Sequence, residues 1–96
     1  ENHGSIPGLE DNDVIETTCL VSKDGIKPVK VTEVPEHCYL LMRLIKMYEK
    51  LTVEAINTRS KETAIQALMQ HPLVNSYSLA KELVAKYDEV YGGIFQ

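Results

Sequence analysis

Two different patterns of hydrophobic and polar residues divide the chain. The stretch from Val14 to Val21 is rich in β-branched residues, a composition typical of strands. Asp24-Gly25 follows, a dipeptide that favours a two-residue hairpin turn in which both central residues have positive φ. The stretch Ile26–Val31 then predicts the returning strand, which Pro28 confines to a sheet edge because proline cannot donate to the ladder. The first 35 residues therefore predict a loop and a β-hairpin.

The second pattern begins at Pro35 and has hydrophobic residues at helical spacing. Proline suits the first turn of a helix, where its missing N–H removes no hydrogen bond. The stripe predicts one helix from Glu36 to about Thr58. Ser60 then caps a second helix, roughly Lys61 to Gln70, and His71-Pro72 ends it, because the residue before proline avoids the helical region.

A third helix completes the predicted architecture. It begins after Ser76 or Ser78 and closes at Gly92-Gly93, with Ile94 or Phe95 folding back over its end. The predicted fold class is therefore α+β, an N-terminal β-hairpin followed by three helices. We expect residues 1–35 and 36–96 to form a single domain.

We expect the first and third helices to pack directly on each other, because both carry apolar residues at helical spacing. Tyrosines on the same stripes are interpreted as core residues. The expected core contacts join Leu41, Leu44, Tyr48 and Leu51 to Leu79, Leu83 and Tyr87.

Composition narrows the classes of function. The chain has 96 residues, enough for one domain. Ten Lys+Arg against 14 Asp+Glu give a net charge of −4. This balance argues against a nucleic-acid partner, which needs a basic surface, and against an anionic membrane. No apolar run approaches the roughly 20 residues of a membrane span.

The cysteines and the N-terminal residues indicate the redox environment of the protein and whether it is part of a longer chain. Cys19 and Cys38 are too few for a disulfide framework, so we expect a reduced, cytoplasmic environment. The chain begins at Glu1 with no initiator Met and no signal-peptide pattern. We therefore expect a piece of a longer protein.

Residues able to carry chemistry are few. His37 and Cys38 are neighbours on a predicted helix, and their side chains point about 100° apart, so they do not coordinate one metal ion together. Cys38 is interpreted as a small core residue. The acidic run Glu10–Asp13 lacks the glycine and the final Glu of a calcium loop, which favours a solvated turn. No glycine-rich nucleotide loop is present. The residues alone predict no catalytic, cofactor-binding or metal-binding side chain.

An ordered set of short motifs goes further. The motifs are Asn2-His3-Gly4-Ser5-Ile6-Pro7-Gly8-Leu9, Val14-Ile15-Glu16, Leu51-Thr52-Val53-Glu54-Ala55, Ala64-Ile65-Gln66-Ala67-Leu68-Met69 and His71-Pro72-Leu73-Val74. In this order they resemble the C-terminal part of glycoside hydrolase family 4, and most of all its 6-phospho-β-glucosidases. One departure is Glu10, where the family usually has a proline.

The resemblance implies a parent enzyme that uses NAD and a divalent metal, usually manganese. It implies hydrolysis of phosphorylated β-glucosides by oxidation, elimination, addition of water and reduction, outside the usual two-carboxylate mechanism. It also implies that this chain is the C-terminal portion of a substrate domain like that of lactate and malate dehydrogenases. The nucleotide-binding domain would then be absent from the chain, and the parent would be a homo-oligomer.

What the resemblance assigns to individual residues is limited. The family's nucleotide loop, metal ligands and catalytic tyrosine have no counterpart here, so His37, Cys38 and Tyr39 inherit no role. Only Asn2 and Gly4 are expected to lie beside the sugar, in a loop that borders the substrate site. The fragment itself is expected to be inactive and to act in structure and oligomerisation. The alternative is a stand-alone helical interaction module without catalysis.

Overall fold

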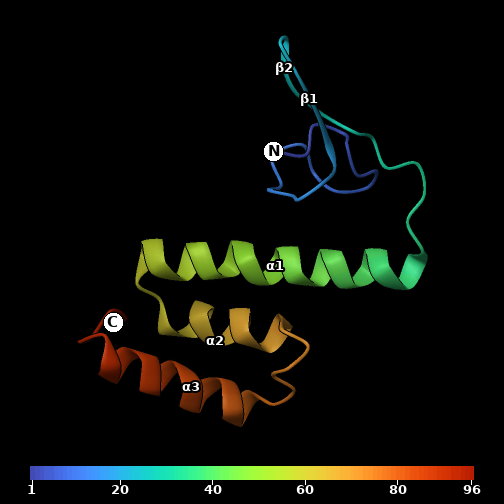
Figure 1. Cartoon of the computed structure of the whole chain (residues 1–96). Helices are drawn as coiled ribbons and strands as arrows, with labels where there is room; N and C mark the ends of the chain where they lie inside the picture. The colour runs from blue at the N-terminus through green and yellow to red at the C-terminus, as the bar shows by residue number, and fades with distance from the viewer. The chain divides into compact units, whose positions relative to one another are not determined.

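Five regular elements are present in the computed structural model, which describes residues 1–96 (Figure 1). Two antiparallel strands, β1 (Cys19–Ser22) and β2 (Gly25–Pro28), precede three helices, α1 (Glu36–Thr58), α2 (Lys61–Gln70) and α3 (Tyr77–Val90). The predicted α+β class, a hairpin followed by three helices, is confirmed. The chain divides into two compact units, Glu1–Tyr39 with the hairpin and Leu40–Gln96 with most of the helical residues.

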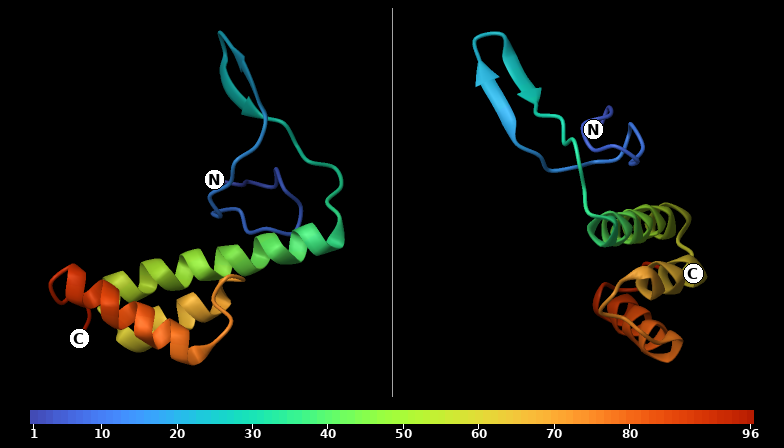
Figure 2. Two further views of the ribbon diagram at one scale, coloured as in Figure 1. Left: turned by 60° about the horizontal axis from the view of Figure 1, so that its bottom comes forward. Right: turned by 90° about the vertical axis from the view of Figure 1, so that its right-hand side faces the viewer.

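The hairpin is shorter than the sequence predicts. Strand β1 begins at Cys19 rather than at Val14, and the two short strands pair as a hairpin (Figure 2). All residues of both strands are exposed. The pairing extends one step beyond the strands, since the Val29 N–H donates to the Thr18 carbonyl at 2.8 Å. A two-stranded hairpin with no covered face has little apolar burial to support a longer ladder.

The predicted turn is displaced by one residue. Ser22 pairs with Gly25, so Lys23 and Asp24 form the turn instead of Asp24-Gly25. Neither turn residue has a positive φ, whereas the next residue, Gly25, has a φ of +114°. The Asp24 N–H donates to Ser22 Oγ at 3.1 Å, and this local side-chain bond supports a turn that starts at the serine.

The helices begin and end where the sequence predicts. Ser60 Oγ accepts the Thr63 N–H at 3.1 Å and caps α2. Ser76, rather than Ser78, caps α3, with Oγ accepting the Leu79 N–H at 3.0 Å. None of the three helices combines the length and the hydropathy needed to cross a lipid bilayer.

The hydrophobic core of the helical unit consists mainly of small side chains. Leu68, Val74 and Phe95 pack around it. Helices α2 and α3 pack side by side, and α1 joins this core through one buried residue. The buried members of the core are Ala55, Ala64, Ile65, Ala80 and Val84.

The expected packing of the first helix on the third is wrong. No Cα atom of α1 lies within 8 Å of a Cα atom of α3, whereas α2 and α3 approach closely. Leu41, Leu44, Leu79 and Tyr87 are exposed, and the other residues of the expected contact are half-buried. Apolar periodicity identifies the face that a helix can bury, but not the helix that covers it.

The C-terminal residues fold back onto α3, as the glycine pair predicts. Gly92 and Gly93 both have positive φ, at +77° and +80°. The Phe95 N–H then donates to the Asp88 carboxylate at 2.8 Å, and Lys61 lies 3.3 Å from the same carboxylate. The hydrogen bond from Phe95, followed by the neighbouring Lys61, lowers the pKa of Asp88 below the usual value for an aspartate.

Ala80 offers a test of the core, because its side chain is completely buried. Ala80→Leu should destabilise the fold by about 1–3 kcal/mol, since added methylenes overpack a tight core. Ala85, on the same helix, is exposed, so Ala85→Leu is the matched control and should leave stability almost unchanged. Urea denaturation of the two variants measures the difference. Equal midpoints would contradict the placement of Ala80.

The Asp88 contacts predict a pH dependence. A carboxyl group whose folded-state pKa is lowered stabilises the fold above its unfolded pKa, and this contribution disappears as the pH falls through the lowered folded value. Acidification below about pH 4 should therefore release the C-terminal residues. Asp88→Asn should remove the dependence. The amide resonance of Phe95, followed by NMR against pH, measures it, and an identical profile in Asp88→Asn would contradict the assignment.

Candidate functional site

The expected substrate loop is built around Asn2. Its side chain is completely buried. The amide nitrogen donates to the carbonyls of Ile6 and Leu9, at 3.1 Å each, and Oδ1 accepts the Ile6 N–H at 2.7 Å. These three bonds close the loop on itself. The Asn2 side chain therefore stabilises the conformation of the loop, because both its nitrogen and its oxygen already bond to backbone groups.

The next two residues, His3 and Gly4, form a turn. His3 has a φ of 44° and Gly4 a φ of 80°, and the left-handed region is unusual for a residue other than glycine. The His3 imidazole is exposed and lies 2.8 Å from the Glu1 carboxylate. A Cβ atom at Gly4 would meet nothing within 4 Å. Gly4 is therefore required by its backbone conformation, and the space beside it is open.

The rest of the loop is tied down by contacts that the sequence does not reveal. The Tyr39 hydroxyl donates to the Gly8 carbonyl at 2.9 Å. A Cβ atom at Gly8 would lie 2.6 Å from the Tyr39 hydroxyl oxygen. The Glu10–Asp13 run is not simply a solvated turn, because Asp13 is buried and its Oδ2 accepts the Glu10 N–H at 2.9 Å. A shallow pocket of about 300 Å³ lies beside Gly8 and Tyr39.

The other candidate residues do not converge on a site. Cys19 and Cys38 are exposed free thiols, so the interpretation of Cys38 as a core residue is wrong. His37 is also exposed. No group of three or more His, Cys, Asp or Glu side chains is placed to hold a metal ion. His71 ends α2, as the sequence predicts, and its ring packs edge-on against Tyr48, with ring centroids 4.9 Å apart.

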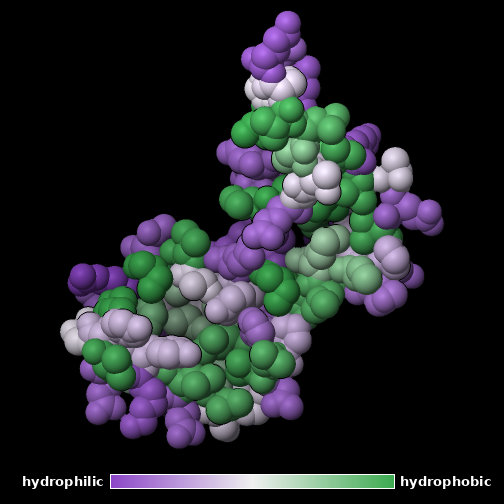
Figure 3. All heavy atoms as spheres, viewed as in Figure 1, coloured by the Kyte–Doolittle hydropathy of each residue, from purple (hydrophilic) through white to green (hydrophobic).

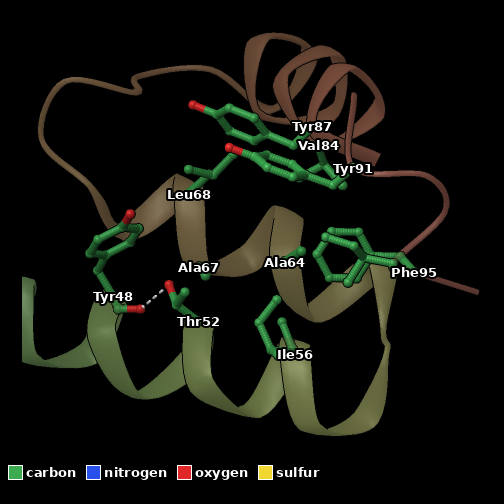
Figure 4. A pocket seen from close by; sticks show the side chains of 12 residues that line it. Tyr48, Thr52, Ile56, Ala64, Ala67, Leu68, Val84, Tyr87, Tyr91 and Phe95 are labelled. Atoms are coloured by element: carbon green, nitrogen blue, oxygen red, sulfur yellow. Dashed lines mark hydrogen bonds between the residues drawn. The ribbon is translucent and has the colours of Figure 1, made fainter. Parts of the chain in front are cut away.

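A second hollow lies between α1 and α3, with α2 as its floor (Figure 4). We call it the helical groove. Its volume is about 220 Å³ and its lining is almost entirely apolar. Tyr48 and Ile56 of α1 face Tyr87 of α3 and Tyr91, the residue that follows this helix, across the groove. Sequence reasoning missed this groove because it assigns the same tyrosines to a closed core.

The comparisons with known proteins agree on one family. The profile of the family 4 glycosyl hydrolase C-terminal domain matches residues 1–74. The chain is 36% identical over 83 residues to 6-phospho-β-glucosidase BglT of Thermotoga maritima, covering 86% of this chain and 20% of that protein. It is 33% identical over 93 residues to phospho-α-glucosidase PagL of Clostridium acetobutylicum, covering 97% of this chain and 21% of that protein.

Solved structures support the same relationship. A 6-phospho-α-glucosidase from gut microorganisms, in complex with NAD and Mn²⁺, superposes with a TM-score of 0.87 and 26% identity over 98% of this chain and 22% of its own. A second such structure, in complex with NAD and glucose-6-phosphate, gives a TM-score of 0.86 and 29% identity, over 99% of this chain and 22% of its own. The chain spans about a fifth of the length of the curated relatives it matches. The matched profile covers more than half of the chain, and the chain therefore belongs to the family 4 glycosyl hydrolases, within their C-terminal domain.

Proposed function

We propose that this chain is the C-terminal portion of an NAD- and divalent-metal-dependent enzyme that hydrolyses 6-phosphoglucosides. The observation that carries the proposal is the match of almost the whole chain, at a TM-score of 0.87, to a phosphoglucosidase solved with NAD and Mn²⁺. The glucose-6-phosphate in the second solved relative supports a phosphorylated sugar as the ligand class.

A β-glucoside is the proposed substrate, with an α-glucoside as the competing candidate. The 36% identity to BglT, a 6-phospho-β-glucosidase, favours the β anomer. The match to PagL at 33% identity and the two solved 6-phospho-α-glucosidases favour the α anomer. Rates on the two p-nitrophenyl 6-phosphoglucoside anomers would distinguish these specificities.

Neither cofactor is assigned to residues of this chain in the proposed enzyme. These residues contain no cluster of metal-ligating side chains and no glycine-rich nucleotide loop. We therefore propose that NAD and the metal, with manganese as the expected ion, bind to other parts of the enzyme. The contribution of this chain is to the substrate loop and to the packing of the domain.

The two compact units are proposed to belong to one C-terminal domain, a portion of a substrate domain like that of lactate and malate dehydrogenases. We also propose that the parent enzyme is a cytoplasmic homo-oligomer. The free edges of the hairpin and the exposed apolar residues Leu20, Val21 and Ile26 support an association surface, because an unpaired strand edge readily pairs with another chain.

Within this enzyme, we propose that the loop containing Asn2 and Gly4 borders the sugar. The open space beside Gly4 allows a ligand to approach the backbone closely. Asn2 is a positioning residue, since its side chain bonds only to the loop. The exposed His3 imidazole, held in a left-handed backbone conformation, is the side chain that this loop presents.

Asn2→Ala should open the loop, because it leaves the buried backbone groups of Ile6 without their side-chain partner, at a cost of about 1–3 kcal/mol for each. The half-buried Leu9 carbonyl also loses its bond. In the complete enzyme, KM for the phosphoglucoside should rise more than kcat falls. Asn12→Ala is the matched control, since Asn12 is exposed in the same loop. Steady-state kinetics and thermal denaturation measure both effects. A loss of stability with KM unchanged would contradict a position beside the sugar.

The 96 residues alone should neither bind NAD nor cleave a 6-phosphoglucoside, because they lack a phosphate-cradling loop. Calorimetry with NAD, with and without Mn²⁺, tests this expectation, and micromolar binding by the isolated chain would refute it. The complete natural protein provides the positive control, since its hydrolysis should require both NAD and Mn²⁺. A complete protein of only 96 residues would favour the stand-alone interaction module.

A further inference from the structure

The helical groove is open because two apolar helices do not meet. The α1 and α3 backbones stay apart, and between them lie exposed side chains that would normally be buried. Ile56 is 49% exposed, Tyr87 50% and Tyr91 68%. Figure 3 shows hydrophobic residues exposed on the helical unit, interspersed with hydrophilic ones. Exposed aromatic and aliphatic groups around a hollow are typical of a surface that receives a partner.

The walls of the groove are held in place by specific contacts. At one end, the edge-on contact between Tyr48 and His71 connects α1 to the end of α2. At the other end, Phe95 is fixed by its bond to Asp88, and the Gln96 N–H donates to the Arg59 carbonyl at 2.9 Å. The groove is therefore a formed feature of the fold, with both ends tied to neighbouring elements.

The lining defines the chemistry of the occupant. No charged residue lines the groove. The Thr52 hydroxyl already donates to the Tyr48 carbonyl at 2.7 Å, so the tyrosine hydroxyls are the polar groups left for a partner. Burying a charged or strongly polar group there would remove it from water without a matching partner. The groove therefore suits aliphatic or aromatic side chains, with a few hydrogen-bond acceptors near the rim.

The length of the relatives indicates where such side chains come from. This fold occupies 22% of the chain in both solved relatives, where the rest of a much longer polypeptide accompanies it. The core formed here is small, with three alanines among its five buried members. A chain of this size buries a modest fraction of its surface alone, and additional polypeptide would supply the missing apolar contacts.

We propose that the helical groove is an intramolecular docking site for an apolar segment of the same polypeptide, outside these 96 residues. This inference rests on the proposed function, which makes the chain part of a longer enzyme. A tethered segment has a high effective concentration, of order millimolar for a short flexible connection. A volume of about 220 Å³ admits a few side chains from such a tethered segment. These considerations favour the same chain over a second copy.

Cysteine labelling of the complete natural protein tests the proposal without requiring activity. In a background with Cys19 and Cys38 replaced by serine, Ile56→Cys places a thiol in the groove. Glu54→Cys places one on the same helix, at an exposed residue outside the groove lining. Maleimide labelling rates are compared for the native and the urea-unfolded protein. Ile56→Cys should be protected by at least about tenfold in the native protein and Glu54→Cys should not, because thiol reactivity follows access.

Each other outcome overturns the proposal in a distinguishable way. Equal native rates for the two thiols would mean that the groove is open. Protection that disappears on dilution to monomer would assign the groove to a second copy. Protection that is lost after unfolding, dialysis and refolding would assign it to a bound apolar molecule. If Ile56→Cys does not fold, Tyr91→Cys is the second probe. Protection in a protein without phosphoglucosidase activity would refute the proposed function and leave the docking site intact.

Discussion

The close approach of α2 and α3 through small side chains is the constraint on which the helical unit depends. Ala80 is fully buried and Val84 nearly so, and both pack against Ala64 and Ile65 of the neighbouring helix. Alanine side chains let two helices approach closely, but they offer little apolar surface on which a third helix could pack. Helix α1 joins the core through Ala55, while Leu41, Leu44 and Ile56 remain exposed. The helical groove is a direct consequence of this geometry.

Local structure was predictable from the sequence because local chemistry determines it. Ser60 and Ser76 cap helices by accepting the N–H three residues later, and such caps act over one turn regardless of tertiary packing. The pair Gly92-Gly93 ends α3 for a similar reason, since both residues adopt positive φ at no steric cost. The displaced hairpin turn shows the limit of such reasoning. Ser22 provides a competing hydrogen bond, and the turn follows the serine rather than the Asp24-Gly25 pair.

Tertiary contacts were less predictable because periodicity does not identify partners. Leu44 and Tyr87 lie on clear apolar stripes, yet both are exposed. Conversely, Asn2 and Asp13 are polar residues of the N-terminal loop, yet both are buried, and their side-chain oxygens accept backbone N–H groups. The Asn2 motif indicates the family, but only the structure shows that its amide serves the loop itself. In the proposed enzyme, the exposed groups beside Asn2, rather than Asn2 itself, are therefore the candidates for contact with the sugar.

The open groove and the internally bonded loop reflect two different ways of holding a short chain in one conformation. Hydrogen bonds between Asn2 and its own loop are local, so they hold their geometry without help from distant polypeptide. Apolar packing is collective, and its strength grows with the amount of surface covered. The loop can therefore be complete within these residues, while the helical unit keeps apolar groups such as Tyr91 exposed. This difference explains why the loop around Asn2 is held by its own hydrogen bonds, while the helices leave part of their apolar surface uncovered.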